Sequence, residues 1–385
     1  MKRKIRMGMV GGGTGAFIGA VHRMAANLDG EIELVCGAFS SDPAKSKASG
    51  EALYLDPARV YGSYKEMILK EKELPESERM DFLSIVTPNH VHFGPAKMGL
   101  ENGFHVMCDK PLCFNLEESY ELKELVEKTG LLFGLTHTYT GYPMVKQARM
   151  MIKNGELGNI RKVVVEYSQG WLSQKVEDTD SKQASWRTDP NRSGIAGAMG
   201  DIGTHAENLA EYVTGLHITE MCADISKIVP GRLLDDDGNV LLRFNNGAHG
   251  VLHASQIAAG EENSLKIYVY GEKGGLEWHQ MEPNTLWMKW LDKPTQKYRT
   301  GVGDLYPAAQ MHTRVPAGHP EGYLEAFANL YRDFAYCIQA RLEGKDVEEV
   351  YTDFPGIEDG VRGMEFIYKV IESGNSDVKW IKLGN

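Results

Sequence analysis

The chain has 385 residues, of which 42% are hydrophobic and 25% charged, a composition typical of a folded globular protein long enough for two domains. Its net charge of -11 argues against a nucleic-acid partner, because phosphate binding needs clustered Lys and Arg. The five cysteines form no Cys-x-x-Cys pair, so we expect no metal site, no disulfide framework and a reducing compartment. The apolar stretch after the basic residues 1–6 is too short for a signal core or a membrane span, and we expect a cytoplasmic protein.

The first third of the chain alternates apolar strands with helices. Expected strands cover residues 5–10, 31–39, 81–88, 104–111 and 131–137, and expected helices cover 19–28, 43–53, 63–71, 92–103 and 116–129. Buried strands that alternate with helices favour a parallel sheet covered on both faces. We therefore predict an α/β fold that begins with a domain on a parallel sheet over residues 1–140.

The pattern changes after residue 141. A helix over 143–154 and a strand over 160–167 precede a Gly-rich polar stretch and a helix over 201–213. From about residue 224 successive β segments are joined by Asn-Gly and Gly-Gly turns, which favour hairpins, and helices return at 322–342 and 356–373. Residues 141–385 are predicted to form an α+β domain on a largely antiparallel open sheet.

A glycine-rich segment, MVGGGTGAFIGAVHR, lies between the first strand and the first helix. Gly11 and Gly13 fill the first two positions of a G-x-G-x-x-G pattern, and the third falls on Ala16, or on Gly19 after a short insertion. Such a loop is either a tight turn or a cradle where backbone N–H groups meet a pyrophosphate. The β-α-β context favours the cradle, so residues 1–140 are predicted to form a Rossmann dinucleotide-binding domain. The residues predicted to hold the dinucleotide here are Gly11, Gly13, Thr14, Gly15 and Ala16.

The end of the second strand should choose between the two nicotinamide dinucleotides. Ser40 and Ser41 stand where an acid is expected, followed by Asp42 and Lys45. Serine and lysine suit the 2′-phosphate of NADP, whereas Asp42 suits the ribose hydroxyls of NAD. Ser41 or Asp42 could instead cap the next helix. The sequence therefore leaves both NAD and NADP open.

Two more segments follow strands of the predicted parallel sheet, TPNHVH and DKP. Their strands end at the carboxyl edge of the sheet, where ligands bind in such folds. Lys110 is either a surface charge or a group that faces the nicotinamide. The cofactor candidates from these segments are Thr87, Pro88, Asn89, His92, Asp109 and Lys110.

In the second domain, the segment GDIGTH places Asp201 and His205 four residues apart. On a helix both project from one face, and a carboxylate can orient an imidazole for proton transfer, although a single helical histidine is usually structural. Before them, Trp186 and Arg187 offer an indole for a sugar face and a guanidinium for hydroxyls. Candidates for substrate contact are Lys110, Tyr139, Trp186, Arg187, Asp201, His205 and His319; His319 could instead merely begin the next helix.

Together the glycine loop, TPNHVH, DKP and GDIGTH resemble the glucose-fructose oxidoreductase, inositol dehydrogenase and rhizopine catabolism (Gfo/Idh/MocA) family. The usual Glu-Lys-Pro of that family reads here Asp109-Lys110-Pro111, and its Asp-x-x-x-His pair falls on Asp201 and His205. The resemblance implies NAD(P)-dependent oxidoreduction of sugars, glycosides or cyclitols, with the 3-hydroxyl of a glucoside as one option. It also implies a homodimer or homotetramer formed through the sheet of the second domain.

The chemistry of alcohol oxidation needs a proton acceptor and a cation near the developing oxyanion. The hypothesis gives Lys110, Asp201 and His205 the catalytic roles. His205 takes the proton, Asp201 orients it and Lys110 hydrogen-bonds the reacting oxygen, or Lys110 is itself the acceptor. Two alternatives are a redox-neutral glycosidase that acts by oxidation and elimination, and a dinucleotide-sensing protein without chemistry.

Overall fold

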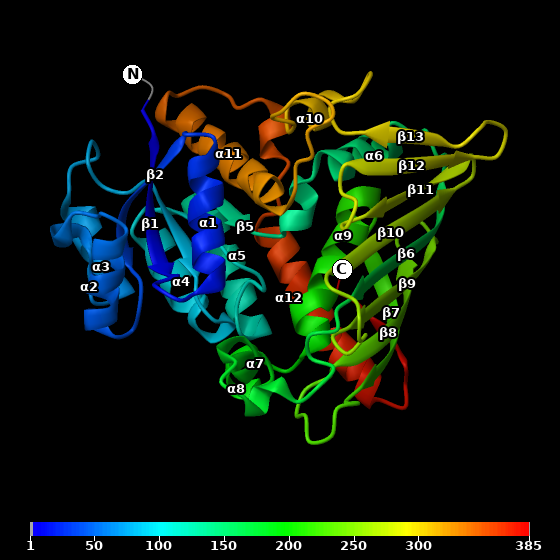
Figure 1. Cartoon of the computed structure of the whole chain (residues 1–385), viewed down its shortest axis with the longest axis horizontal. Helices are drawn as coiled ribbons and strands as arrows, with labels where there is room; N and C mark the ends of the chain where they lie inside the picture. The colour runs from blue at the N-terminus through cyan, green and yellow to red at the C-terminus, as the bar shows by residue number, and fades with distance from the viewer. Residues whose placement is uncertain (1–2, 385) are drawn as a thin grey trace. The chain divides into compact units, whose positions relative to one another are not determined.

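The computed structural model describes residues 3–384, which form two compact units (Figure 1). The first unit runs to residue 138 and also takes in residues 327–361. The second comprises residues 139–326 and the chain from residue 362 onward. The sequence places a boundary at residue 140 and assigns 327–361 to the second domain, whereas the contacts of this segment group it with the first unit.

The first unit is built on a parallel sheet of five strands in the order β2-β1-β3-β4-β5. The strands are β1 (Ile5–Gly11), β2 (Ile32–Ala38), β3 (Phe82–Val86), β4 (His105–Cys108) and β5 (Phe133–Leu135). Most of their residues are buried, as expected for a sheet with helices on both faces. The predicted Rossmann-type parallel sheet is confirmed.

The helices of this unit begin and end at recognisable capping residues. Asp42, Ser63 and Asn115 each accept a backbone N–H at a helix start, and Gly130 ends a helix in the left-handed conformation. The α-helices are α1 (Phe17–Leu28), α2 (Pro43–Ala52), α3 (Tyr64–Glu73), α4 (Phe93–Glu101), α5 (Leu116–Thr129) and, from residue 327, α11 (Tyr323–Leu342). Short 3₁₀ turns are η1 (Pro57–Arg59), η2 (Asn89–Val91), η3 (Thr138–Gly141), which ends in the second unit, and η6 (Glu349–Thr352).

The second unit is built on a sheet of nine strands in the order β13-β12-β11-β10-β6-β9-β8-β7-β14. The strands are β6 (Ile160–Ser168), β7 (Ile218–Ser226), β8 (Asp237–Phe244), β9 (His249–Ser255), β10 (Ser264–Gly271), β11 (Gly274–His279), β12 (Thr285–Trp290), β13 (Gln296–Arg299) and β14 (Trp380–Lys382). Among these, β6 and β9 pair in parallel and the other neighbours are antiparallel. The predicted, largely antiparallel sheet is confirmed.

Helices cover one face of this sheet. Figure 1 shows α6 and α9 against it, and the strand residues that share their face, such as Val163, Val165 and Leu252, are fully buried. Alternate residues such as Val164 and Tyr268 are partly exposed. The helices are α6 (Pro143–Lys153), α7 (Lys182–Arg187), α8 (Pro190–Ser193), α9 (Thr204–Thr214), α10 (Pro307–Gln310) and α12 (Ile357–Asn375), with η4 (Val176–Asp178) and a π-helical turn η5 (Met199–Gly203).

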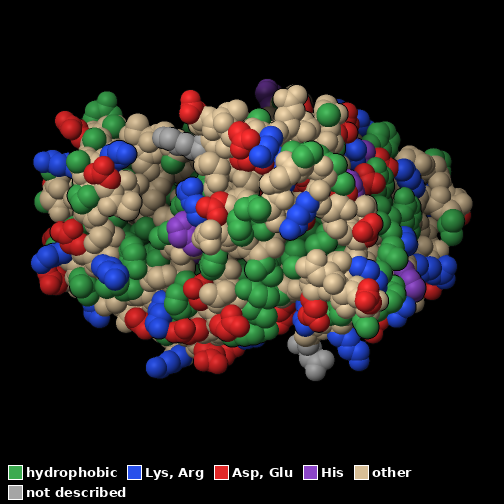
Figure 2. All heavy atoms as spheres, turned by 90° about the horizontal axis from the view of Figure 1, so that it is seen from below, with side chains coloured by type: hydrophobic (Ala, Val, Ile, Leu, Met, Phe, Trp, Pro, Cys, Tyr) green, Lys and Arg blue, Asp and Glu red, His purple; other side chains and the backbone are tan. Residues whose placement is uncertain are grey.

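The surface carries both signs of charge. Figure 2 shows acidic and basic side chains interspersed over the visible face rather than gathered by sign. Within residues 3–384, no helix is long and apolar enough to cross a membrane. The same residues contain no cluster of His, Cys, Asp and Glu able to hold a metal ion.

Candidate functional site

The glycine loop has a backbone that only glycine adopts easily. Gly11, Gly12 and Gly15 have positive φ angles of 82°, 68° and 82°. A Cβ atom on Gly19 would lie 2.3 Å from the Cα of Gly12, so α1 approaches the loop closely because residue 19 lacks a side chain. Gly19, rather than Ala16, therefore occupies the position where helix and loop pack together.

The loop is also open where a diphosphate would need space. A Cβ atom on Gly15 would meet nothing within 4 Å, and α1 begins after Ala16 without a side-chain cap. The N–H of Thr14 donates to the Ser49 Oγ at 3.1 Å, and Arg23 donates to the Gly12 carbonyl at 2.6 Å, which fixes the loop from both sides. An uncapped helix start beside an open, braced glycine loop fits a dinucleotide.

The segment after β2 shows a helix cap. The Asp42 carboxylate accepts the backbone N–H groups of Ala44 at 2.9 Å and Lys45 at 3.3 Å, and so caps α2. Ser40 accepts the N–H of Asp42 at 3.1 Å, while Ser41 and Lys45 are exposed. The capping alternative is thus present in the structure for Asp42, whose oxygen Oδ1 is already engaged by the helix start.

After β3, Thr87 carries a buried hydroxyl that has no hydrogen-bond partner within the described part of the chain. Its methyl group lies 2.7 Å from where a Cβ of Gly11 would stand, so the hydroxyl is beside the glycine loop. A buried hydroxyl without a partner is costly unless a ligand completes it. Pro88 and the buried Asn89 continue this turn into η2.

His92 lies between the segments that follow β3 and β4. Its ring is fully buried, with Nδ1 2.8 Å from the Pro111 carbonyl and Nε2 2.8 Å from the Thr87 carbonyl. Burial lowers its pKa, which the two carbonyls and Asp109 only partly offset. Because both nitrogens face the backbone, His92 joins the segments after β3 and β4, and its contact with a cofactor stays a prediction.

The segment Asp109-Lys110-Pro111 follows β4, with a cis bond before Pro111. One carboxylate oxygen of Asp109 accepts the N–H of Lys110 and the hydroxyl of Thr136, both at 2.9 Å. Burial opposes ionisation of Asp109, but His22 and Lys110 outweigh it and hold the pKa of this carboxyl well below its usual range. Asp109 is therefore an anchored anion directly before the partly exposed Lys110.

In the second unit, Asp201 lies in the π-helical turn η5, and His205 lies in the first turn of α9. One Asp201 oxygen accepts from Arg187 Nε at 3.0 Å and from Gln256 Nε2 at 2.9 Å. The ring of His205 meets that of Tyr139 edge-on, with centroids 4.9 Å apart. The predicted single helix over 201–213 is thus wrong at its start, because the chain makes a wider turn at Asp201.

Tyr139 belongs to a polar network beside His205 whose other members the sequence does not predict. The Tyr167 hydroxyl donates to Asn263 Oδ1 at 2.6 Å and also contacts the hydroxyl of Tyr139. Asn263 Nδ2 in turn donates to the Tyr139 hydroxyl at 3.1 Å. Gln169 donates to the same Asn263 oxygen at 2.7 Å. Burial raises the pKa of both tyrosines, so both remain neutral donors. The sequence predicts Tyr139 as a substrate contact but not its partners. Those partners lie at or next to strand termini, which is the signal that could have found them: Tyr167, Gln169, Gln256 and Asn263.

Two tryptophans flank the guanidinium that holds Asp201. Arg187 Cζ lies 4.3 Å from the centre of the Trp186 ring and 5.9 Å from that of Trp171. The structure thus brings Trp186, Arg187 and Asp201 together. His319 is exposed, and its Nδ1 lies 3.0 Å from the Pro316 carbonyl within its own loop. Because α11 begins at Tyr323, His319 does not begin that helix, and its contact with a substrate stays a prediction.

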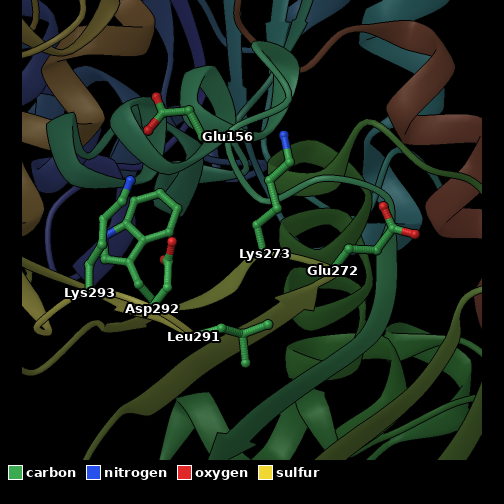
Figure 3. Close-up of a pocket in the computed structure, with 7 residues that line it drawn as sticks. Glu156, Glu272, Lys273, Leu291, Asp292 and Lys293 are labelled. Carbon is green, nitrogen blue, oxygen red and sulfur yellow. The ribbon is translucent and has the colours of Figure 1, made fainter.

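A separate recess of about 590 Å³ lies on the second unit (Figure 3). Its lining is of mixed charge, and Lys293 Nζ lies 4.7 Å from the centre of the Trp290 ring. None of its residues belongs to the polar network around Asp201. The lining residues are Glu156, Glu272, Lys273, Trp290, Leu291, Asp292 and Lys293.

Comparisons with known proteins agree with this arrangement. Residues 5–137 match the family model described as oxidoreductase family, NAD-binding Rossmann fold, and residues 145–277 match the GFO/IDH/MocA C-terminal domain. An uncharacterized oxidoreductase of Bacillus subtilis, YfiI, is 33% identical over 99% of this chain and 98% of its own. The chain is thus an oxidoreductase with an NAD-binding Rossmann domain. It belongs to the Gfo/Idh/MocA family.

Solved structures are similar over the whole length. An oxidoreductase from Sinorhizobium meliloti is 46% identical, with a TM-score of 0.88 over 99% of this chain and 100% of its own. An inositol dehydrogenase homolog from Azotobacter vinelandii, complexed with NAD+, is 36% identical, with a TM-score of 0.93 over 99% and 97%. An inositol dehydrogenase homolog from Azotobacter vinelandii, complexed with NADH and myo-inositol, is 35% identical, with a TM-score of 0.90 over 99% of this chain and 98% of its own.

Proposed function

We propose that this protein moves a hydride between NAD(P) and a secondary hydroxyl or ketone of an uncharged sugar, glycoside or cyclitol. The observation that carries the proposal is the set of polar groups around Asp201 and His205, in which Arg187 is paired with Asp201, in a chain whose other unit is an NAD-binding Rossmann fold. The myo-inositol in the Azotobacter homolog supports a cyclitol or sugar as the substrate class.

The charges in the second unit favour a substrate without a phosphate or carboxylate. Arg187 is the cation beside Asp201, and its ion pair with that carboxylate at 3.0 Å leaves little net charge. Asn263, Gln169 and Gln256 each offer both a donor and an acceptor, which suits hydroxyl groups. The indole of Trp186 adds an apolar surface for the C–H face of a sugar ring.

The first unit supplies the cofactor site in this proposal. NAD(P) provides the hydride acceptor or donor, and residues 11–16 with the Thr87 hydroxyl would hold it. The residues that would face the adenosine ribose are Ser40, Ser41 and Lys45. One Asp42 oxygen is already used in the α2 cap, and we therefore propose that the site accepts both NAD and NADP. Equal rates with the two cofactors, or a modest preference, would support this.

Proton transfer is assigned to side chains of both units. We assign proton acceptance from the substrate hydroxyl to His205 and stabilisation of the developing oxyanion to Lys110. Asp201, anchored by Arg187 and Gln256, would orient the His205 imidazole. Tyr139 would orient the His205 ring through their edge-on contact.

A substrate screen tests the proposal. Polyols, cyclitols and glycosides are incubated with NAD or NADP, keto-sugars are incubated with NADH or NADPH, and the nicotinamide absorbance is followed. We expect cofactor reduction with at least one neutral cyclitol or sugar and none with its phosphorylated form. Release of phenol from a nitrophenyl glycoside without net NADH would instead indicate the redox-neutral glycosidase, and binding without any hydride transfer would indicate the sensing protein.

The uncovered face of the nine-stranded sheet suggests self-association. Leu241 on β8 and Tyr270 on β10 are 50% and 42% exposed there, and Val251 on β9 is paired with Leu241. Exposed apolar side chains on a broad sheet face are typical of subunit interfaces. We propose a homodimer or homotetramer formed through this face.

Cysteine use supports the proposed location. All five cysteines are free thiols, and four of them are buried. Unpaired thiols are typical of a reducing compartment, so we propose that the protein works in the cytoplasm.

A further inference from the structure

A buried chain of polar groups lies within the first unit. The imidazole of His22, on α1, is fully buried and packs edge-on against Phe327, with ring centroids 4.6 Å apart. Its Nδ1 lies 2.6 Å from the hydroxyl of Tyr331 on α11. The same hydroxyl lies 2.8 Å from the Oγ of Ser84 on β3. Three elements thus meet through one imidazole ring and two hydroxyls.

The other end of the imidazole faces the segment after β4. Its Nε2 lies 3.8 Å from Asp109 Oδ2 and has no hydrogen-bond partner among residues 3–384. The second oxygen of Asp109 is held by the N–H of Lys110 and the hydroxyl of Thr136. The carboxylate therefore has His22 on one side and the backbone of Lys110 on the other.

Burying the His22 imidazole in this way lowers the stability of the fold, so we expect the side chain to have a role beyond packing. A buried imidazole with an incompletely satisfied nitrogen is less favourable than an apolar side chain of similar volume. The neighbours of His22 include Phe327, and the ring of Phe82 lies beside Tyr331, so an apolar residue would suit the site. What the imidazole adds is a directed contact with the anion that precedes Lys110.

We propose that His22 and Tyr331 are positioning residues that act through Asp109 on Lys110. Tyr331 orients the His22 ring, the ring holds the Asp109 carboxylate, and the carboxylate fixes the N–H of Lys110. The proposal rests on the function proposed above for Lys110. The low pKa of Asp109, to which His22 contributes, agrees with an anion held in this way.

Other titratable groups also surround this anion and enter any pH profile. His92 and Lys110 act on Asp109, and His137, after β5, feels both Lys110 and Asp109. The groups that face the His22–Asp109 pair from neighbouring elements are Lys110, His92, His137, Cys108 and Tyr331.

The kinetic test removes a single hydroxyl. Tyr331→Phe keeps the ring but leaves Nδ1 of His22 without its partner, and we expect kcat to fall about tenfold, the worth of one buried hydrogen bond. The KM for the dinucleotide should stay within about twofold and the pH profile of kcat should shift, because the change reaches Lys110 and not the glycine loop. Tyr336→Phe, on the same helix, is the control and should leave all three quantities unchanged.

A conservative pair of variants tests the role of the imidazole. His22→Leu should lower kcat at least as much as Tyr331→Phe, and His22→Gln, which retains a donor, should recover part of the loss. Unchanged kcat and pH profile in Tyr331→Phe would overturn the proposal. So would equal activity in His22→Leu and His22→Gln, because a purely structural ring would not distinguish the two.

A spectroscopic test is independent of any substrate. Nitrogen NMR of the full chain with isotope-labelled histidine gives the His22 resonances, assigned by their loss in His22→Gln. We expect the Nδ1 signal to move in Tyr331→Phe and the Nε2 signal to move in Asp109→Asn, with neither moving in Tyr336→Phe. Unmoved signals would overturn the proposal even in an active enzyme, whereas moved signals in a protein without hydride transfer would contradict only the proposed function.

Discussion

At the scale of single residues, Lys110 and His205 carry the proposed proton chemistry. Lys110→Ala and His205→Ala should each lower kcat about 100-fold or more, the usual worth of general acid–base catalysis. Steady-state kinetics with the best substrate from the screen measures this. Lys97→Ala and His249→Ala, at exposed or partly exposed positions, are matched controls that should remain fully active. Turnover close to that of the wild type in either site variant removes that residue from the mechanism.

Thr87 allows a test of the cofactor site alone. Thr87→Val keeps the shape and removes a buried hydroxyl that has no partner among the described residues. We expect dinucleotide affinity to fall about fivefold to tenfold, because one hydrogen bond to the ligand is lost, while thermal stability stays equal or rises slightly. Titration calorimetry and thermal unfolding measure the two effects. Unchanged affinity would place the dinucleotide away from this hydroxyl.

Individual residues were predictable where their chemistry depends on local sequence. The glycine loop and the Asp42 cap follow from neighbours along the chain, and the structure shows both. The position of His92 after β3 predicts a cofactor contact, whereas the observed partners of its ring nitrogens are the carbonyls of Thr87 and Pro111. Tyr167 and Asn263 were missed, since the contacts that unite them join residues about a hundred positions apart.

At the scale of elements, two helical glycines form a matched pair. A Cβ atom added to Gly19 in α1 would lie 2.3 Å from the Cα of Gly12. A Cβ atom added to Gly363 in α12 would have no other atom within 4 Å. Gly19→Ala should therefore displace the glycine loop, weaken dinucleotide binding at least tenfold and lower the melting temperature. Gly363→Ala should stabilise by about 0.5–1 kcal/mol through helix propensity. Normal binding in Gly19→Ala would mean that the close approach of α1 is not needed.

Strand β4 contributes a pH dependence through His105. Burial, assisted by Arg341, lowers the pKa of His105 to about 4, from an ordinary value of 6.5, and its Nδ1 accepts the N–H of Leu132 at 3.0 Å. The unfolded chain therefore binds more protons between pH 6.5 and 4, so stability is complete above this window and falls as the pH is lowered through it.

His105→Asn should retain the acceptor and remove the titration. The pH dependence of the urea midpoint between pH 6.5 and 4 should become flatter, by up to about 1 kcal/mol per pH unit in free energy of unfolding. His249→Asn, at an exposed histidine, is the control. An identical slope in wild type and His105→Asn would show that His105 does not set the acid response.

Helices and strands whose apolar residues repeat regularly, or whose ends carry capping residues, could be predicted from the sequence. Short elements without such a repeat could not. The helix over residues 116–129 was predicted at its true bounds, because Asn115 and Gly130 mark its ends. Strands β13 and β14 have four and three residues with mostly exposed side chains, so they carry no alternation that a sequence could reveal. The π-helical turn at Asp201 depends on contacts of Gly197 and Met199 with Asp235, far along the chain.

At the scale of the whole molecule, the uncovered sheet face predicts an assembly. Leu241→Arg places a charge at a position that is 50% exposed on β8 and should lower the mass in solution, ultimately to the monomer. Leu291→Arg, at a loop position that is 83% exposed, is the control and should leave the mass unchanged. Analytical ultracentrifugation measures both. A monomeric wild type, or an unchanged mass in Leu241→Arg, would contradict assembly through this face.

The two-part organisation was predictable, but the path of the chain was not fully so. The change from parallel to antiparallel patterning near residue 141 gave the order of the two sheets. The return of residues 327–361 to the first unit depends on contacts such as those of Tyr331 with His22 and Ser84, which no local pattern encodes. Contacts between residues so far apart in the chain cannot be predicted from local sequence patterns.

Isotope transfer from substrate to cofactor tests directly whether this protein moves a hydride. A neutral cyclitol or sugar from the screen, deuterated at the reacting carbon, is incubated with NAD or NADP, and the nicotinamide product is analysed by mass spectrometry. We predict deuterium in the reduced cofactor for wild type and at least about 100-fold slower labelling in Lys110→Ala and His205→Ala. A protein that binds the dinucleotide yet labels it with no member of the panel would contradict the account.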